Sequence, residues 1–228
     1  MAKKKDNRVI LVRNTIIGFI TVVAILIFGF GTYVSTGLAE GEITAEDYRE
    51  VDRPKPRRQG EPIEVVEFFA YTCVHCKNFD PIIEDWADDQ PDDVKFSRQP
   101  AMWSPIQNLL GQTYLTLESL GALEDNHARI FRALHDAGRQ FLTPEMMADY
   151  VDGRGVERDA FLREFNSPRI KQALRDANRE NREFQISATP SIMVGGRYVV
   201  SMNGGGARAL DVVEYLLEKI RTEEAGTG

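Results

Sequence analysis

The sequence predicts an α/β fold that is interrupted by an all-helical insertion and preceded by a single N-terminal transmembrane helix. Two observations predict this arrangement: an uncharged apolar run near the amino terminus, and two strand-forming regions separated by a long block with helical periodicity. The chain has 228 residues, 43% of them hydrophobic, so it is long enough for a folded domain and too apolar to be disordered. Its two cysteines are too few for a small disulfide-stapled protein.

The charge is unevenly distributed along the chain. The net charge is -7, but residues 1–14 carry a balance of +4, so the remaining 214 residues sum to -11. The basic residues of the first segment are Lys3, Lys4, Lys5, Arg8 and Arg13, against Asp6 alone. Nucleic-acid phosphate is bound by clustered basic side chains, so a domain this acidic argues against a nucleic-acid partner.

The amino-terminal apolar run extends from Ile16 to Val34, over 19 residues without a charge. A helix of ~20 apolar residues crosses a bilayer, and flanking basic residues stay on the cytoplasmic side. We therefore predict a cytoplasmic segment at 1–14, a membrane anchor at 15–36 and an extracytoplasmic, periplasmic remainder. The alternative is a signal peptide cleaved near Ala39, which would give a secreted protein, although apolar cores of signal peptides are usually shorter, at ~7–15 residues. Both alternatives deliver the remainder to an oxidising compartment.

Residues 37–62 are polar and lack a sustained apolar period. They contain Pro54, Pro56 and Pro62, and proline-rich polar segments form semi-rigid spacers. We therefore predict a linker over 37–62, and a short tail at the other end of the chain, at 223–228.

Strand and helix signals alternate at 63–100. Ile63 to Tyr71 is rich in β-branched and aromatic residues and almost continuously apolar, which is typical of a central strand buried on both faces. A helical stretch follows through about Ala87, and Val94 to Gln99 forms the next strand. Together with a later region at 185–222, this segment forms the α/β part of the fold.

The intervening block at 101–184 has helical periodicity and repeated helix-start signals. In each signal a hydroxyl residue precedes a proline that suits the first helical position. These pairs are Ser104-Pro105, Thr143-Pro144 and Ser167-Pro168. The block contains a stripe of apolar residues that we assign to core packing: Ile106, Leu109, Leu110, Tyr114, Leu117 and Leu120.

Strand signals return between Ser191 and Ser201, where Gly195-Gly196 can supply the positive φ angles of a two-residue hairpin turn. A last amphipathic helix is predicted from about Ala207 to Thr222. Its inward-facing residues are Leu210, Val213, Leu217 and Ile220.

Cys73 and Cys76 follow the first strand, and three roles compete for them: a structural disulfide, half of a metal site, or a redox couple. A disulfide across two residues closes a very small loop and gains little unfolded-state entropy. A zinc site needs two further ligands, but the histidines outside the motif, His127 and His135, lie in the distant helical block. The position after a buried strand and at a helix start favours the redox couple.

At a helix start, unpaired backbone amides and the helix dipole place about +0.5 of a charge beside the first sulfur, which favours the thiolate of Cys73. His75 can add a donor or a positive charge, and Cys76 lies one turn inward on the same helical face. We expect Cys73 to be the exposed, attacking sulfur and Cys76 the shielded, resolving one. A couple whose reduced form is stabilised in this way tends to oxidise other thiols.

Glu67 lies within the apolar strand, six residues before Cys73, where an unpaired carboxylate costs several kcal/mol to bury. Its functional interpretation is a proton acceptor and donor near Cys76. The alternative is a half-exposed position on an edge strand. The apolar neighbours favour the functional interpretation.

The run from Glu67 to Cys76 (EFFAYTCVHC), the helical block and the later Ala188-Thr189-Pro190 resemble the DsbA-like group of thioredoxin-fold thiol-disulfide oxidoreductases, over roughly residues 60–222. The resemblance implies a thioredoxin fold with a helical insertion and a cis Pro190 facing the cysteines. It implies that the catalytic residues are Cys73, His75, Cys76, Glu67 and Pro190, with substrate binding at Thr189, Pro190 and Val74.

Two positions depart from the family pattern. The DsbA type usually has proline where Val74 stands, and commonly has valine where Thr189 stands. These positions tune redox potential and partner release, and threonine before the cis proline is also similar to the disulfide isomerases.

We predict a membrane-tethered oxidase that introduces disulfides into exported proteins through the Cys73/Cys76 pair, without a metal or an organic cofactor. Its partners would be unfolded or reduced exported proteins and, as the resemblance implies, a quinone-linked membrane protein that reoxidises it. Two alternatives stay open: a reductase or isomerase on the same fold, and a non-catalytic substrate-binding assembly factor.

Overall fold

The computed structural model describes residues 14, 16–23, 42–58 and 60–226. Residues 16–23 are helical, and their apolar side chains are largely exposed. No helix within these described ranges is long and apolar enough to cross a membrane. The greater part of the predicted anchor at 15–36, the cytoplasmic segment at 1–13 and the Ala39 cleavage position lie outside the described residues.

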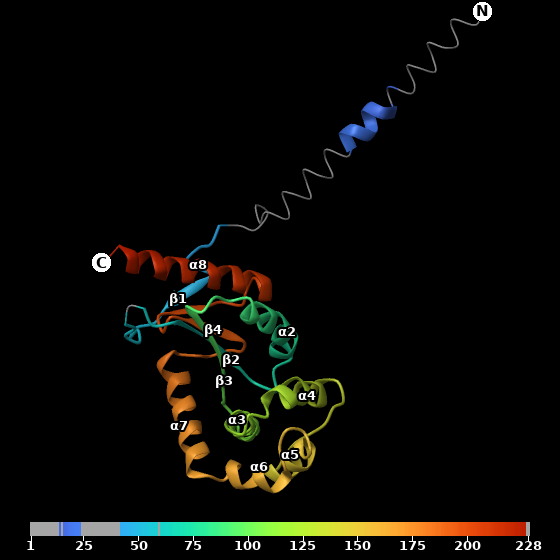
Figure 1. The fold of residues 1–228 in the computed structure, drawn as a ribbon, viewed down its shortest axis with the longest axis vertical. Coiled ribbons are helices and arrows are strands. Elements are labelled where there is room, and N and C mark those ends of the chain that lie inside the picture. Colours follow the sequence, from blue (N-terminus) through green and yellow to red (C-terminus); the bar gives the residue numbers. More distant parts are fainter. Residues whose placement is uncertain (1–13, 15, 24–41, 59, 227–228) are drawn as a thin grey trace, which may run out of the picture. The chain divides into compact units, whose positions relative to one another are not determined.

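The chain from Thr44 onward forms one compact unit around a five-stranded sheet with the order β1-β5-β4-β2-β3 (Figure 1). β2 runs parallel to β3 and antiparallel to β4, so both of its edges are paired, as its continuous apolar run predicts. The strands are β1 (Tyr48–Glu50), β2 (Ile63–Phe69), β3 (Val94–Pro100), β4 (Ser191–Val194) and β5 (Tyr198–Val200).

The helices fall into two groups. α2 (Val74–Asp88) and α8 (Gly205–Ala225) contact each other, and α8 also contacts β4 and β5. The other group lies between β3 and β4 in the sequence and forms the helical insertion, which Figure 1 shows as a separate layer beside the sheet. It comprises α3 (Pro105–Ser119), α4 (Leu123–His135), α5 (Pro144–Val151), α6 (Arg158–Phe165) and α7 (Pro168–Glu183).

All three predicted helix starts in the insertion are confirmed. Ser104, Thr143 and Ser167 are the N-cap residues of α3, α5 and α7, and each side-chain oxygen accepts a hydrogen bond from the backbone N–H three residues later. The proline that follows each cap occupies the first turn, where a missing N–H costs nothing. The sequence therefore set these boundaries locally.

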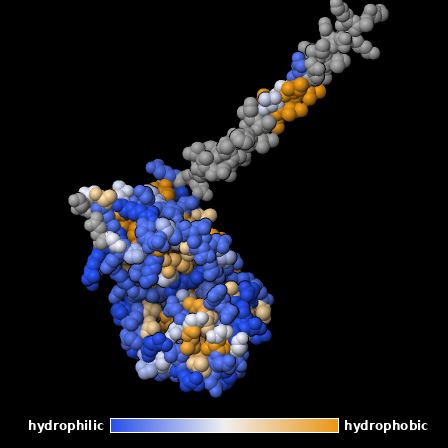
Figure 2. Space-filling model, in the orientation of Figure 1, coloured by the Kyte–Doolittle hydropathy of each residue, from blue (hydrophilic) through white to orange (hydrophobic). Residues whose placement is uncertain are grey.

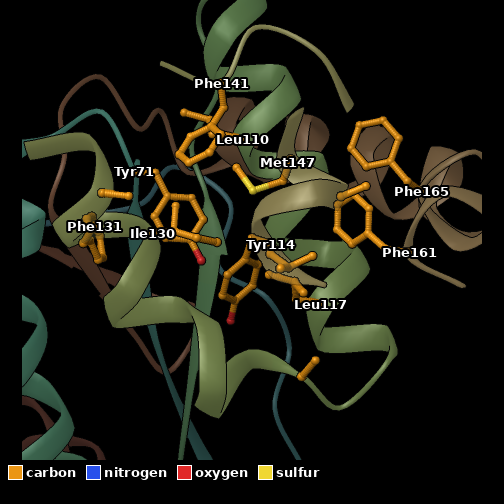
Figure 3. Packing of buried hydrophobic residues seen from close by; sticks show 14 of the residues in the cluster. Tyr71, Leu110, Tyr114, Leu117, Ile130, Phe131, Phe141, Met147, Phe161 and Phe165 are labelled. Carbon is orange, nitrogen blue, oxygen red and sulfur yellow. The ribbon is translucent and has the colours of Figure 1, made fainter. Parts of the chain in front are cut away.

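The two faces of β2 serve different cores, because successive strand residues point to opposite sides of a sheet. Val66 and Phe68 pack with Phe184 and Ile186, which follow α7. Phe69 instead joins the core of the insertion, as do Tyr71 and Cys76 beyond the strand. Figure 3 shows this core, with Tyr71 beside residues of the helical insertion: Leu110, Tyr114, Ile130, Phe131 and, in the loop before α5, Phe141.

The structure corrects the linker predicted at 37–62. Tyr48–Glu50 forms β1, which pairs antiparallel with β5, and the adjacent Val51 is buried. This strand carries no sequence signal because it is short and lies at the sheet edge, where backbone hydrogen bonds to a distant segment suffice without an apolar pattern. The folded unit therefore begins well before Ile63.

Two further boundaries differ from the prediction. Gly195 and Gly196 do have positive φ angles, of 60° and 65°, but Val194 pairs with Tyr198, so the hairpin loop has three residues rather than two. The last helix continues to Ala225, into the predicted tail at 223–228. Its sequence contains no proline, and the helix ends at the C-cap Gly226.

Candidate active site

Cys73 is the N-cap residue of α2, so its sulfur occupies the position that a serine or aspartate oxygen usually fills. Cys73 has an extended backbone, with φ -93° and ψ 114°, and its Sγ accepts a hydrogen bond of 3.2 Å from the Cys76 backbone N–H. An N-cap acceptor beside the positive end of a helix is stabilised as an anion. The predicted position of the first sulfur is therefore confirmed.

The two thiols differ in exposure and in acidity. Cys73 is half-buried and Cys76 is fully buried, and both are free thiols. The hydrogen bond from the Cys76 thiol, together with bonds from the Thr189 side chain and from the Cys76 and His75 backbone amides, lowers the pKa of Cys73 to about 5 against the opposing effect of burial. Burial and the hydrogen bond with Cys73 raise the pKa of Cys76.

The loop before β4 lies against the sulfur of Cys73. The Thr189-Pro190 peptide bond is cis, and Cys73 Sγ lies 3.3 Å from the Thr189 carbonyl oxygen, to which it donates a hydrogen bond while the thiol is protonated. The structure therefore brings together the cysteine pair, Thr189 and Pro190, which are more than a hundred residues apart in the sequence.

A cavity of about 350 Å³ borders this site, between the start of α2, the Pro190 loop and the loop before α8. His75 is exposed and lines it, whereas Val74 is 47% exposed and does not line it. Other lining residues are Phe79, Ile82, Thr189, Pro190 and Met202. A mostly apolar recess beside a half-buried sulfur can accept a peptide side chain.

Glu67 is 1% exposed and lies on β2, a strand paired on both edges, which excludes the alternative of a half-exposed edge position. Burial raises the pKa of Glu67 to about 8, with the Asp80 charge adding to the rise and the Arg98 charge opposing it. Glu67 and Cys73 also interact electrostatically. A buried carboxyl that titrates near neutral pH can donate or accept a proton during thiol exchange.

Sequence reasoning missed the residues around Glu67. Arg98 of β3 is the register partner of Glu67, and its Nε donates to Glu67 Oε2 at 3.1 Å. Asp80 of α2 and His127 of α4 complete the buried polar group. Glu67 and Arg98 are each the fifth residue of their strands, and these matching positions could have predicted that the two side chains pair. Nothing in the sequence places His127 beside them.

Among the residues that the structure describes, no three His, Cys, Asp or Glu side chains lie close enough together to hold a metal ion. An acidic thiol at a helix start, a buried second thiol three residues later and a cis proline against the first sulfur define a thiol-disulfide oxidoreductase of the thioredoxin fold.

Comparison with known proteins assigns the family. Residues 57–101 match the thioredoxin family, and residues 110–218 match the DSBA-like thioredoxin domain. The chain is 38% identical to the thiol:disulfide interchange protein DsbA of Pseudomonas aeruginosa over 185 residues, which cover 80% of this chain and 88% of that protein. It is 37% identical to the protein of the same name from Azotobacter vinelandii, covering 87% of this chain and 94% of the other. The chain therefore belongs to the DsbA-like family of thiol-disulfide oxidoreductases.

Solved structures agree with this assignment. The crystal structure of Pseudomonas aeruginosa DsbA matches with a TM-score of 0.74 and 39% identity, covering 78% of this chain and 93% of that one. The structure of oxidoreductase DsbA from Xylella fastidiosa matches with a TM-score of 0.74 and 31% identity, covering 79% and 98%. The similarity extends over nearly all of each relative.

Proposed function

We propose that this oxidoreductase is an oxidase that introduces disulfides into exported proteins. The observation that carries the proposal is the acidity of Cys73, whose pKa is lowered to about 5 while the pKa of its partner Cys76 is raised. A thiolate stabilised in the reduced enzyme makes the disulfide form easier to reduce, and therefore a stronger oxidant of other thiols.

In the proposed reaction a substrate thiolate attacks the Cys73 sulfur of the oxidised pair. A bond forms between the substrate sulfur and Cys73, the Cys73–Cys76 bond breaks, and its electron pair leaves on Cys76. Glu67, which is protonated near neutral pH, gives its proton to Cys76. A second substrate thiolate then attacks the substrate sulfur of the mixed disulfide, which leaves the substrate oxidised and Cys73 as a thiolate.

Substrates would bind as extended chains beside Thr189 and Pro190, with a side chain in the cavity of about 350 Å³, and would contact the exposed Val74 next to Cys73. Reoxidation would require a quinone-linked membrane protein: Cys73 attacks its disulfide, and Cys76 returns its proton to Glu67 as it resolves the mixed disulfide. The uncharged run at Ile16 to Val34 supports a tether to the same membrane, with the catalytic domain in the periplasm.

The equilibrium of the Cys73/Cys76 couple against glutathione tests the direction of the reaction. We expect the disulfide to be reduced by glutathione at low ratios of reduced to oxidised glutathione, as an oxidant requires. A strongly reducing couple would instead assign the chain to the reductases. Thr189, which precedes the cis proline, keeps an isomerase as the second candidate, and turnover of a scrambled-disulfide substrate by the reduced enzyme would favour it.

Two further experiments test the class of function and the tether. A chain with both Cys73→Ala and Cys76→Ala should lose activity in cells, because both sulfurs of the redox pair are removed. Retained activity would instead indicate an assembly factor whose cysteines are incidental. Alkaline extraction of membranes should leave the full-length chain in the membrane pellet, and its release with a new amino terminus near residue 39 would show cleavage instead.

A further inference from the structure

The buried polar group around Glu67 extends across the fold into the helical insertion. Arg98 Nη2 lies 3.0 Å from Asp80 Oδ1, and His127 Nε2 lies 3.0 Å from the same oxygen. The hydroxyl of Tyr71 then lies 2.8 Å from His127 Nδ1. Asp80, His127 and Tyr71 are 5%, 7% and 2% exposed, so these contacts are shielded from water.

The chemistry of the partners fixes the direction of each hydrogen bond. Although burial opposes it, the hydrogen bond from His127 and the Arg98 charge hold the pKa of Asp80 below its usual range, so Asp80 is an acceptor. Burial lowers the pKa of His127, so its ring is neutral and carries one proton. We assign that proton to Nε2, which donates to Asp80, because Nδ1 is then free to accept from the Tyr71 hydroxyl.

One guanidinium is shared between two buried carboxyls, and it cannot compensate both negative charges. Arg98 donates a hydrogen bond to Glu67 through Nε, whereas its Nη2 is close to Asp80 without hydrogen-bond alignment. The donor that aligns with Asp80 is His127. An ionised carboxyl in a buried site depends on such donors, so the loss of one would move a proton to Asp80.

We propose that His127 is a positioning residue of the redox reaction: by donating to Asp80 it keeps that carboxylate ionised beside Arg98, and thereby leaves the single proton of the carboxyl pair on Glu67. The proposal rests on the proposed use of that proton by Cys76. It gives the helical insertion a chemical role, since α4 supplies a group that acts on the active-site strand through α2.

Other titratable groups also face these side chains, and they come from the neighbouring elements. Cys73 and Tyr114 of α3 interact with Glu67, and Glu84 of α2 interacts with His127. Burial raises the pKa of Tyr114, which keeps it uncharged. Glu84 favours a charged His127, but burial outweighs it. None of these groups replaces the hydrogen bond to Asp80.

Two amide variants of His127 distinguish the effect of the hydrogen bond donated to Asp80 from the effect of any polar side chain at this position. In His127→Gln the amide nitrogen can take the place of Nε2 and donate to Asp80, whereas in His127→Asn the amide is too short and reaches only the place of Nδ1. The readout is the titration of Glu67 in the full-length chain in detergent, followed by ¹³C NMR of labelled glutamate carboxyls and assigned with Glu67→Gln.

We expect the parent and His127→Gln to titrate alike, near the pH of about 8 given by the burial of Glu67. In His127→Asn, Asp80 takes up a proton, Arg98 then serves Glu67 alone, and the Glu67 midpoint falls by about one unit or more, a tenfold change in protonation. Adding His127→Asn to Asp80→Asn should then produce no further shift. An unchanged midpoint in His127→Asn, or equal shifts in both amide variants, would overturn the proposal.

A measurement on the unaltered protein gives the answer even where a variant does not fold. The ¹⁵N shifts of His127 should show a neutral ring with its proton on Nε2 at neutral pH. A charged ring, or a proton on Nδ1, would overturn the proposal. The Glu67 midpoint could move as expected while the pH profile of thiol exchange stays unchanged. In that case His127 does keep the proton on Glu67, and only the proposed transfer of that proton to Cys76 is refuted.

Discussion

The acidity of Cys73 depends first on the hydrogen bond from Cys76, so replacing Cys76 should change the reactivity of the sulfur that remains. A hydrogen bond to a charged group contributes ~1.5–3 kcal/mol, and one pKa unit corresponds to ~1.4 kcal/mol, so its loss should raise the pKa by about 1 to 2 units. Because Cys73 is half-buried and solvent reaches it, we expect the lower end of this range for Cys76→Ala. Cys76→Ser keeps an O–H donor and should stay close to the parent.

Alkylation by iodoacetamide as a function of pH measures this difference directly. The chain has two cysteines, so Cys73 is the sole thiol in both variants. With the parent midpoint at a pH of about 5, we expect Cys76→Ser near that value and Cys76→Ala near a pH of ~6. Equal midpoints in the two variants would refute the role of the Cys76 hydrogen bond. A parent midpoint near the ordinary thiol value of ~8.5 would refute the acidity of Cys73 altogether.

Two predictions concern the surroundings of the pair. The folded-state pKa of Glu67, about 8, lies above its unfolded value of ~4.3, so its contribution to stability is complete below that lower pH and is lost as the pH rises through 8. In chemical denaturation of the reduced protein, the free energy of unfolding of the parent relative to Glu67→Gln should fall over this window by up to ~1.4 kcal/mol per pH unit. A difference that does not change with pH would contradict the assignment. His135 of α4 donates from Nε2 to the Tyr71 carbonyl oxygen at 2.9 Å, so His135→Ala should cost ~1 kcal/mol and speed hydrogen exchange in the 70–73 loop, with His135→Gln as the conservative control. Unchanged exchange in both variants would show that this bond does not hold the loop.

The exposed surface supports a role in binding other chains. In Figure 2 most of the visible face of the unit from Thr44 onward is hydrophilic, with an apolar area over the helical insertion. The exposed large apolar side chains include Val74, which follows Cys73 in the sequence, and Trp103, at 47% and 49%. Their exposure agrees with the proposed binding of extended substrates.

Features that depend on neighbours in the sequence were predictable. The N-caps Ser104, Thr143 and Ser167 bond to amides three residues away, so their helices start where the local pattern indicates. The apolar run of β2 indicates burial on both faces, and the burial of Glu67 followed from its neighbours. The order of the two thiols followed from the helix start alone.

Features that depend on distant partners were not predictable from one sequence. β1 forms because β5 supplies its hydrogen bonds, and a polar segment carries no mark of such a partner. The same holds for His127, whose sequence context suggests only a possible metal ligand and which the structure places against Asp80. Its signal lies in the packing of α4 on α2, and no periodicity encodes that.

The sequence by itself determined which sulfur is the more acidic, because the hydrogen bond that lowers the pKa of Cys73 most comes from Cys76, in the first turn of the same helix. The tertiary structure alone decided how the buried proton is held: Glu67, Arg98, Asp80 and His127 come from four separate elements, and their charges interact only once water has been excluded between them.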